Sequence, residues 1–246
     1  MKIIKRKTES TLMGSPVLML ANWKSGQEIL DRESGIVEKY QPGYIYCAVD
    51  ATDLLTIQQL EGSGFRFSEF RIQSTLNTSQ TEVSTHAFFP FQAGLVNEKE
   101  DLEKARDILL SSKKHDRFSK DPNLGENFSR KRLEANLRKS FKSYPKEFLL
   151  GLYNSQRGEL VAFRSGAFLS TLEAHYYQYG VIQESDFEHT ASMLEAFTIE
   201  FLKNQGIQII HAVSTGFNTP ELNRLLKNYD FRIANTQVLL KKAYNF

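Results

Sequence analysis

Three side chains that could handle a proton lie close together at the start of one predicted strand. Side chains alternate between the two faces of a strand, so Glu173, His175 and Tyr177 lie on one face. Tyr176 and Gln178 then lie on the other face. An unperturbed His titrates near neutral pH, which makes His175 and Glu173 the candidate general bases. The alternative is an ordinary solvated strand end without a chemical role.

Metal and nucleophile chemistry find little support in the residue pattern. No group of His, Cys, Asp and Glu has the spacing of a metal site, so no metal is expected. The Gly-x-Ser-x-Gly motif is absent, and Cys47 has no His close to it in the sequence. Neither a serine nor a cysteine nucleophile is therefore predicted.

Residues 113–142 form a basic segment, with ten Lys or Arg against four Asp or Glu. Arg can hold a diphosphate through paired hydrogen bonds, so the segment could bind a phosphorylated small molecule. The alternatives are a solvated helix face and a nucleic-acid surface. No basic motif interleaved with aromatic residues appears, and the net charge is only +2, so no nucleic-acid partner is expected.

The composition is that of a globular protein. The chain has 246 residues, 41% hydrophobic and 24% charged, which is enough to bury a core. No apolar run is long enough to span a membrane, and the basic start at residues 1–7 is not followed by the apolar stretch of a signal peptide. With one cysteine, Cys47, no internal disulfide can form, and the cytoplasm is the expected location.

Hydrophobic periodicity and turn residues predict a mixed α/β order over the last two thirds of the chain. Strands are expected near residues 93–96, 148–153, 160–169, 174–182, 207–213 and 231–241. Helices are expected near 98–110, 129–141, 185–205 and 219–226, with a polar loop over 113–127 and a hairpin turn at 154–159.

The first third predicts a strand–helix–strand unit of its own. Residues 44–49 and 65–72 are the strands, and 54–60 form the helix between them. Upstream, residues 16–39 carry apolar side chains at helical spacing and are predicted as a helix.

A polar stretch at residues 77–85 is the best candidate for a linker. We therefore expect an N-terminal α/β half-domain over 1–79, a linker over 80–90 and a second domain over 91–246.

The two ends of the chain also share a local pattern. Tyr44–Val49 followed by Phe65 matches Ile209–Val213 followed by Phe231, each with a leucine-containing helix between. Common ancestry and chance both account for this similarity.

The element order over residues 91–246 resembles the fold of the GCN5-related N-acetyltransferases (GNAT). The matching stretches are Asp116–Phe118 leading to Phe128, the hairpin at 154–159, and Val213 to Phe231. Together with the N-terminal unit, the layout is similar to acetyltransferases of amino-sugar nucleotides, such as the dTDP-fucosamine acetyltransferases. The resemblance implies a mixed α/β (α+β) sheet, preceded by a partial GNAT-like unit.

The resemblance also implies a donor site. In the family, two neighbouring parallel strands part and hold the pantetheine arm of acetyl-CoA or another pantetheine thioester. The corresponding groups here are the backbone of Val181, Ile182 and Gln183 and the side chain of Asn218. Gly180 inside this strand fits a bulge or a close backbone approach, although an ordinary strand glycine is equally compatible.

The acceptor implied by the resemblance is a small-molecule amine. The basic segment would overhang it, so Arg117, Phe118, Arg130 and Tyr177 are the candidate substrate-binding residues. A Glu near the position of Glu173 often acts in the family through a bound water.

The sequence departs from the family where the donor's pyrophosphate would bind. The family usually has Gln/Arg-x-x-Gly-x-Gly/Ala there, whereas residues 183–191 contain no glycine and no arginine. Glu184, Asp186 and Glu188 would repel phosphates. Ser185 and Glu188 also have the spacing of a capping box, which would use the helix-end amides internally.

A second departure concerns the proton donor. The family's tyrosine falls at Leu225 or Leu226, and Tyr229 is displaced by about a turn. The family's glycine before the last strand is Asp230.

Two hypotheses follow. The first is a cytoplasmic N-acyltransferase, most simply an acetyltransferase, that acts on a small amine such as an amino-sugar nucleotide, possible as a homodimer. The alternative is a catalytically degenerate GNAT-fold binding module that does not use acetyl-CoA.

Overall fold

The computed structural model describes residues 1–85, 88–111, 117–124, 126–182 and 186–244. Its strands are β1 (Lys2–Lys5), β2 (Val17–Ala21), β3 (Tyr44–Asp50), β4 (Arg66–Asn77), β5 (Phe91–Leu95), β6 (Glu147–Asn154), β7 (Glu159–Phe168), β8 (Glu173–Val181), β9 (Ile209–Thr215) and β10 (Arg232–Ala243). Its helices are α1 (Lys7–Met13), α2 (Gly26–Tyr40), α3 (Leu54–Gly62), α4 (Lys99–Ser111), α5 (Arg117–Lys120), α6 (Glu126–Lys142), α7 (Phe187–Asn204) and α8 (Thr219–Asn228), with a 3-10 turn at Thr78–Gln80.

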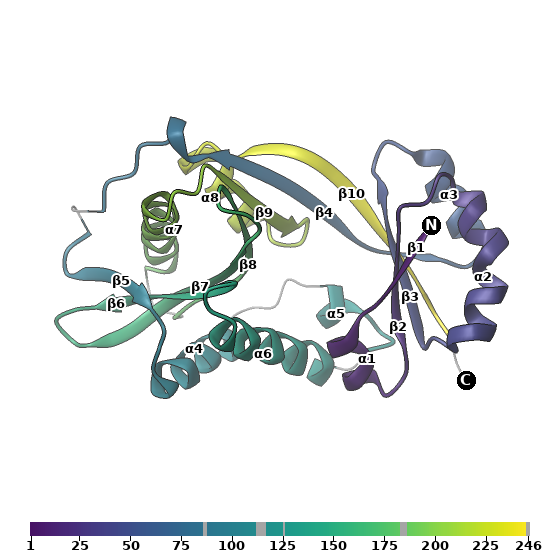
Figure 1. Cartoon of the computed structure of the whole chain (residues 1–246), viewed down its shortest axis with the longest axis horizontal. Coiled ribbons are helices and arrows are strands. Elements are labelled where there is room, and N and C mark those ends of the chain that lie inside the picture. The colour runs from purple at the N-terminus through teal and green to yellow at the C-terminus, as the bar shows by residue number, and fades with distance from the viewer. Residues whose placement is uncertain (86–87, 112–116, 125, 183–185, 245–246) are drawn as a thin grey trace.

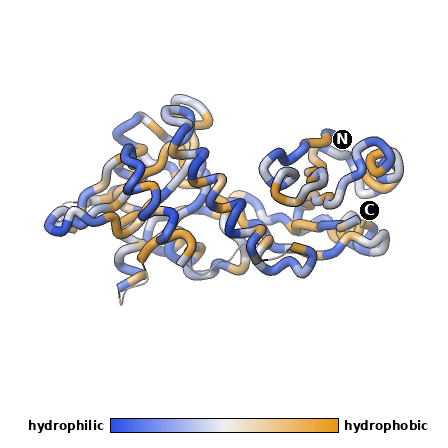
Figure 2. The backbone as a smooth tube through the Cα atoms, turned by 90° about the horizontal axis from the view of Figure 1, so that it is seen from below, coloured by the Kyte–Doolittle hydropathy of each residue, from blue (hydrophilic) through white to orange (hydrophobic). Residues whose placement is uncertain are grey.

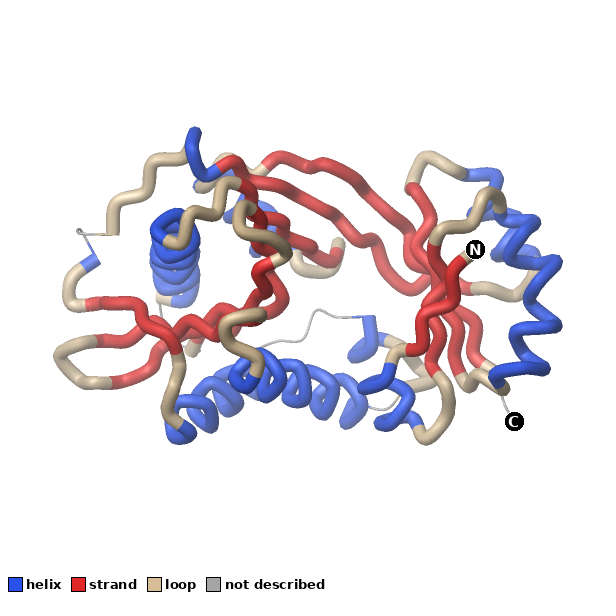
Figure 3. The backbone as a smooth tube through the Cα atoms, viewed as in Figure 1, coloured by secondary structure: helices blue, strands red, loops and turns tan. Residues whose placement is uncertain are grey.

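These strands form one continuous sheet in the order β1-β2-β3-β10-β4-β9-β8-β7-β6-β5. The pairs β2–β3 and β8–β9 are parallel, and the other neighbouring pairs are antiparallel. Figure 1 and Figure 3 show the long strands β4 and β10 running side by side from one half of the molecule to the other. The sheet therefore joins the two ends of the chain without a break.

Helices cover both faces of the sheet, and each face has its own buried core. In the C-terminal half, α7 and α8 pack on one face, and α4 and α6 pack on the other. In the N-terminal half, α2 and α3 cover one face, while α5 lies on the opposite face with the start of α6. Figure 2 shows hydrophobic segments in both halves, in agreement with these separate cores. The long helix α6 extends from α4 to α1 and α5, so it bridges the two halves (Figure 1).

The largest error of the sequence prediction is at residues 16–39. Val17–Ala21 is strand β2, between β1 and β3, and the helix begins only at Gly26 with Ser25 as its cap. Of the four consecutive apolar residues from Val17, three are buried and Met19 is half-buried, so they do not alternate as a half-exposed strand would. A short apolar run of this kind does not distinguish helix from strand.

The predicted elements of the C-terminal half are confirmed with small shifts at their ends. The polar loop over 113–127 is partly wrong, because it contains the short helix α5 and the first residues of α6. The hairpin turn at 154–159 is confirmed, and Gly206 ends the region of α7 with a positive φ of 82°.

The two similar strand–helix–strand units exchange their second strands. Strand β4 follows β3 in the chain but pairs with β9 and β10, and β10 follows β9 but pairs with β3 and β4. The sheet order β3-β10-β4-β9 is the result. The boundaries at 1–79, 80–90 and 91–246 stay a prediction, while the hydrogen bonds of these strands connect the regions on either side.

No helix in the described ranges is both long and apolar enough to cross a bilayer.

Candidate functional site

The parallel strands β8 and β9 part after a short shared ladder. They pair at three positions, Glu173 with Ile209, Ala174 with Ile210 and His175 with His211. Beyond His175, strand β8 stays with β7 and strand β9 stays with β4. The parting expected near Gly180 is therefore confirmed, and it begins five residues earlier.

The edge of β8 that faces the opening carries free backbone groups. The amide of Ile182 donates to the carbonyl of Val161 on β7 at 3.0 Å. In an antiparallel ladder, hydrogen-bonded residue pairs alternate with non-hydrogen-bonded pairs. Gly180 therefore also bonds to β7, whereas the N–H and C=O groups of Tyr179 and Val181 point away from β7. The backbone groups of Val181 thus have no partner on β7, whereas the amide of Ile182 is bonded to that strand. Gln183 lies outside the described residues.

A β-bulge interrupts β8 next to this edge. Ser165 pairs with Gln178 and Gly166 with Tyr176, which leaves Tyr177 as the extra residue. The bulge breaks the alternation, so Gln178 lies on the α6 side and donates from Nε2 to the carbonyl of Leu133 at 3.2 Å. The prediction that Gln178 shares a face with Tyr176 is therefore wrong.

Gly180 is a site of close packing and not the bulge. A Cβ atom there would lie 2.5 Å from the ring of Phe163 and 2.9 Å from Ile108. These nearest atoms belong to side chains, so neither the bulge nor a close backbone approach accounts for this glycine.

The parted strands open into a cavity of about 1040 Å³. Its wall combines β4, β6, β8 and β9 with helices from both faces of the sheet. We distinguish two ends, named after their helices. The α8 end is lined by Tyr179, Phe187, Glu188, Asn218, Pro220 and Glu221. The α6 end is lined by Arg6, Glu69, Arg71, Arg132, Lys139, Glu147, His175 and Tyr177.

His175 is held in one tautomer by the backbone of β9. Its Nδ1 lies 3.1 Å from the carbonyl oxygen of His211, and a carbonyl can only accept, so Nδ1 carries the proton. Burial lowers the pKa of His175. The hydrogen bond to the His211 carbonyl raises it in part, and the charges of His211 and Arg71 lower it further. The ring is therefore neutral near pH 7, with the lone pair on Nε2 ready to accept a proton.

Glu173 does not line the cavity and contacts His211, the residue that pairs with His175. Its carboxylate accepts a hydrogen bond from Nε2 of His211 at 2.9 Å. Glu173 thus fixes the residue whose carbonyl holds His175.

The predicted substrate-binding residues divide into two groups. Tyr177 lines the cavity, and its ring meets that of His175 edge-on at 5.5 Å. Arg117 is buried behind the wall, 3.8 Å above the ring of Tyr46 and 3.8 Å from Glu69, which does line the cavity. Phe118 packs with Arg117, whereas Arg130 is not part of the cavity wall.

A buried charge cluster underlies the α8 end. Arg164, 2% exposed, pairs with Glu195 at 2.5 Å and with Glu221 at 3.3 Å. The rings of Tyr176 and Tyr179 flank its guanidinium at 4.6 and 4.7 Å. Burial raises the pKa of Glu221 in spite of the attraction of Arg164, since the two carboxylates share one cation.

Arg224 is the second cation of this cluster. It is 3% exposed and lies over the ring of Tyr179 at 5.2 Å. Its guanidinium makes no hydrogen bond within the described part of the chain, and Glu188 is 3.5 Å away. The cap of α7 is Asp186, whose side chain makes no capping bond. The predicted cap, Ser185, lies outside the described residues.

Neither Leu225 nor Tyr229 can donate a proton into the cavity. Leu225 is buried, as expected for a leucine at this position, and Tyr229 donates to the backbone carbonyl of Ser192. Asn218 lines the cavity, where its Nδ2 donates to Glu221 at 2.7 Å; it makes no side-chain capping bond.

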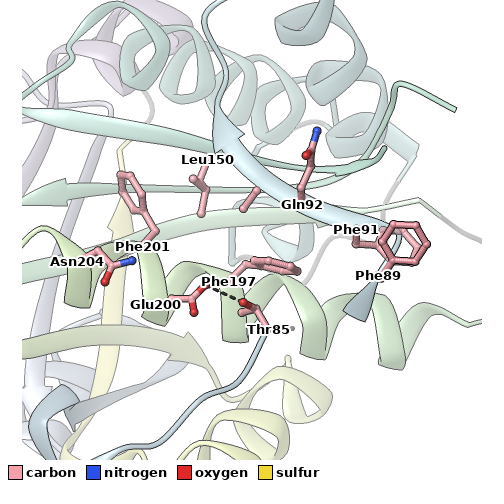
Figure 4. A pocket seen from close by; sticks show the side chains of 10 residues that line it. Thr85, Phe89, Phe91, Gln92, Leu150, Phe197, Glu200, Phe201 and Asn204 are labelled. Atoms are coloured by element: carbon pink, nitrogen blue, oxygen red, sulfur yellow. Dashed lines mark hydrogen bonds between the residues drawn. The ribbon is translucent and has the colours of Figure 1, made fainter. Parts of the chain in front are cut away.

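A smaller hollow of about 440 Å³ lies elsewhere, between β5 and α7 (Figure 4). Its wall is mainly aromatic and aliphatic, and its carboxylate, Glu200, accepts a hydrogen bond from Thr85 at 2.8 Å. Among its described lining residues, no set of groups could transfer a proton.

Cys47 is buried in the N-terminal core, and burial raises the pKa of its thiol to about 12, so it is a poor nucleophile. In the part of the chain that the structure describes, no three His, Cys, Asp or Glu side chains gather as a metal site.

Sequence reasoning missed the charged residues that the fold gathers at the cavity: Arg6, Arg71, Arg164, Glu195, Glu221 and Arg224. A signal existed for Arg164, which is a single charge inside the apolar run 160–169. No comparable signal marks Arg6 and Arg71, because they reach the cavity from distant parts of the chain.

Comparison with solved structures identifies the fold. A GCN5-related N-acetyltransferase from Sphaerobacter thermophilus superposes with a TM-score of 0.64 at 12% identity, covering 98% of this chain and 75% of that one. A GCN5-related N-acetyltransferase from Kribbella flavida gives 0.62 at 12% identity, covering 94% and 82%. A tandem GNAT protein of the clavulanic acid biosynthesis pathway gives 0.61 at 11% identity, covering 94% and 76%.

No family model and no curated protein matches the sequence. The chain therefore has the GNAT fold, and at these identities the likeness concerns the fold alone.

Proposed function

We propose that this chain is an N-acyltransferase that moves an acyl group, most simply acetyl, from a pantetheine thioester to the primary amine of a small molecule. The observation that carries the proposal is the parting of β8 and β9 into a cavity that reaches both faces of the sheet. A GNAT fold with this opening has the slot that an extended thiol-bearing arm requires.

The donor arm would lie along β8. The free N–H and C=O groups of Tyr179 and Val181 offer a strand edge to the amides of pantetheine. Val213 and Ser214 of β9 form the opposite wall, and Asn218 adds a side-chain amide. The hydroxyl of Ser214 is buried without a partner among the described residues, so a ligand in the slot would satisfy it.

The chemistry then needs one base and one acid. The amine nitrogen attacks the thioester carbonyl carbon, the C–S bond breaks, and Nε2 of His175 takes the amine proton. Glu173 serves as a positioning residue through His211. The departing thiolate receives a proton from the carboxyl group of Glu221, whose raised pKa keeps it protonated more often than an ordinary glutamate.

The narrower proposal for the acceptor is an amino-sugar nucleotide, as in the dTDP-fucosamine acetyltransferases. Arg117 and Phe118 lie next to the α6 end and Tyr177 lines it, which supports an acceptor with both an anionic and a flat part. We further propose a cytoplasmic location, with Cys47 kept reduced, and a homodimer as a form to test by light scattering.

The alternative is a GNAT-fold binding module that does not use acetyl-CoA. It is favoured by the carboxylates near the start of α7 and by the engaged hydroxyl of Tyr229. The two functions differ in donor binding, since the binding module has lost the donor site and transfers no acyl group.

The test is calorimetry of the full chain with acetyl-CoA, CoA and acetyl-pantetheine, which lacks the adenosine and its phosphates, followed by thiol release with a panel of amines. We expect acetyl-pantetheine to bind and Ser214→Leu, which fills the slot, to weaken binding at least tenfold at an unchanged melting temperature. Absence of heat with all three ligands at millimolar concentration would overturn the acyltransferase and favour the binding module. Binding of a thioester without turnover on any amine of the panel would contradict both functions.

A further inference from the structure

The α6 end of the cavity is assembled from both halves of the chain. Arg6 comes from the start of α1, and Glu69 and Arg71 come from one face of β4. Across the cavity, Arg132 and Lys139 come from α6. The N-terminal half thus supplies a wall of the same cavity that holds His175.

Most of the charges at this end have a partner. Lys139 is ion-paired with Glu147, Arg6 with Glu9 at 3.4 Å, and Arg117 with Glu69 at 3.8 Å. Each of these cations is therefore at least partly balanced by a carboxylate.

Arg71 differs from these neighbours. Its guanidinium has neither a hydrogen bond nor an ion pair with the described residues, although it lines the cavity and is half-buried. Burial lowers the pKa of Arg71, and the nearby charge of Arg117 lowers it further, with a smaller effect of Arg6, against the attraction of Glu69. Positive charge is thus crowded around a cation that water screens incompletely, and an anion placed there would be stabilised.

Arg71 also stands close to the base. Its charge contributes to the environment of His175, and its register partner on β9, Thr215, lines the cavity. A group bound by Arg71 is therefore part of the molecule whose amine meets His175.

We infer that Arg71, flanked by Arg6 and Arg117, binds an anionic group of the acceptor, so that the acceptor is a primary amine that also carries a carboxylate or a phosphate. The inference rests on the proposed acyl transfer, because only that reaction makes the bound amine an acceptor. The anion site itself depends on the arginines alone. The N-terminal half of the chain is then a substrate-binding part of the site. An arginine provides five donors in a planar fork, which suits both carboxylate and phosphate.

The test compares amines that differ in one anionic group, glucosamine 6-phosphate with glucosamine and glycine with glycinamide, in the full chain and in Arg71→Met. We expect the wild type to prefer the charged member of at least one pair. Arg71→Met should lower kcat/KM for that member roughly ten- to a hundredfold more than for the neutral member. Arg71→Lys should recover part of the loss.

Arg232→Met is the matched control, because Arg232 is an exposed arginine of β10 outside the cavity wall. Arg232→Met should change kcat/KM for neither amine of a pair. The pair in which the charged amine is preferred shows whether the site binds a phosphate or a carboxylate. The inference is overturned if the wild type treats charged and neutral members alike, or if Arg71→Met lowers both equally.

A binding measurement separates this inference from the proposed function. Inorganic phosphate and glucosamine 6-phosphate are titrated into the wild type and Arg71→Met without donor. Loss of anion binding in Arg71→Met supports the site even if no thioester binds, in which case only the acyl transfer fails. Equal anion binding in both proteins overturns the site even if acetyl-pantetheine binds and is turned over.

Discussion

The two ends of the cavity bury charge in opposite ways. At the α8 end, Arg164 is held between Glu195 and Glu221, and Arg224 faces Glu188, so carboxylates outnumber cations among the described residues. At the α6 end, cations outnumber carboxylates.

The difference separates structural charges from binding charges. A buried cation with carboxylates on both sides stabilises the fold, and removing it leaves buried charge behind. A cation without a partner contributes nothing of this kind, but it can bind a ligand of opposite sign. On this comparison the α8 end suits the uncharged pantetheine arm, and the α6 end suits an anionic acceptor.

The largest expected effect is on stability. Arg164→Met would leave Glu195 and Glu221 buried without their cation and should lower the free energy of unfolding by about 3–5 kcal/mol. Chemical denaturation measures this change. Arg106→Met is the control: Arg106 pairs with Glu134 at 2.8 Å on the surface, and its loss should cost no more than about 1 kcal/mol. Equal losses in the two variants would contradict the larger contribution of the buried ion pair.

Replacement of the proposed acid should slow the reaction. Glu221→Gln keeps an amide oxygen for Asn218 but has no proton to give, so kcat should fall about a hundredfold. In the wild type, kcat should fall as the pH rises through the raised pKa of Glu221, because the protonated carboxyl is the active form. This limb should be missing from the pH profile of Glu221→Gln and present in Glu159→Gln, an exposed carboxylate on β7. An unchanged profile would assign the proton to another group.

A smaller effect is expected for the donor's phosphates. Glu188 is 64% exposed and lies 3.5 Å from Arg224. Glu188→Gln removes a repelling charge and frees Arg224, so acetyl-CoA should bind several-fold more tightly, while acetyl-pantetheine should bind as before. Calorimetry with both ligands measures the difference, and Glu38→Gln on α2 is the control. Equal affinities of wild type and Glu188→Gln for acetyl-CoA would contradict the charge argument.

The smallest expected effect is a shift of the pH profile when Arg71 is replaced. Burial lowers the pKa of His175, and the base must be neutral, so the acidic limb of kcat/KM should lie below pH 6.5. Arg71→Met removes a positive neighbour, which raises the pKa of His175 and moves this limb to higher pH, by less than about one unit. The profile is measured with a neutral amine, so that acceptor binding does not contribute. A limb that moves to lower pH would contradict the placement of Arg71 beside His175.

Local patterns predicted much of the C-terminal half. The apolar runs of β6, β7 and β9, the helical spacing of α4, α6 and α7, and the turn at 154–159 depend on neighbours in the sequence, and they were found close to where they were expected. The parting of β8 and β9 was also expected, but from the resemblance to the GNAT fold and not from periodicity.

Sequence reasoning failed where packing decides. Val17–Ala21 is a strand because β1 and β3 flank it, and Gln178 turns to the α6 side because of a bulge set by the partner strand. Neither the flanking strands nor the partner strand that sets the bulge can be predicted from the residues of these segments alone.

What the sequence determined by itself is therefore the type and order of most elements, the candidate base at His175 and the lack of a phosphate-binding glycine motif after β8. The tertiary structure decided the exchange of β4 and β10 and, through it, which charges share a cavity. The physical reason is range: turns and amphipathic faces are selected over a few residues, whereas strand partners are selected by burial and hydrogen bonding across the whole chain. Arg71 and His175, about a hundred residues apart, share a wall only because β4 pairs with β9.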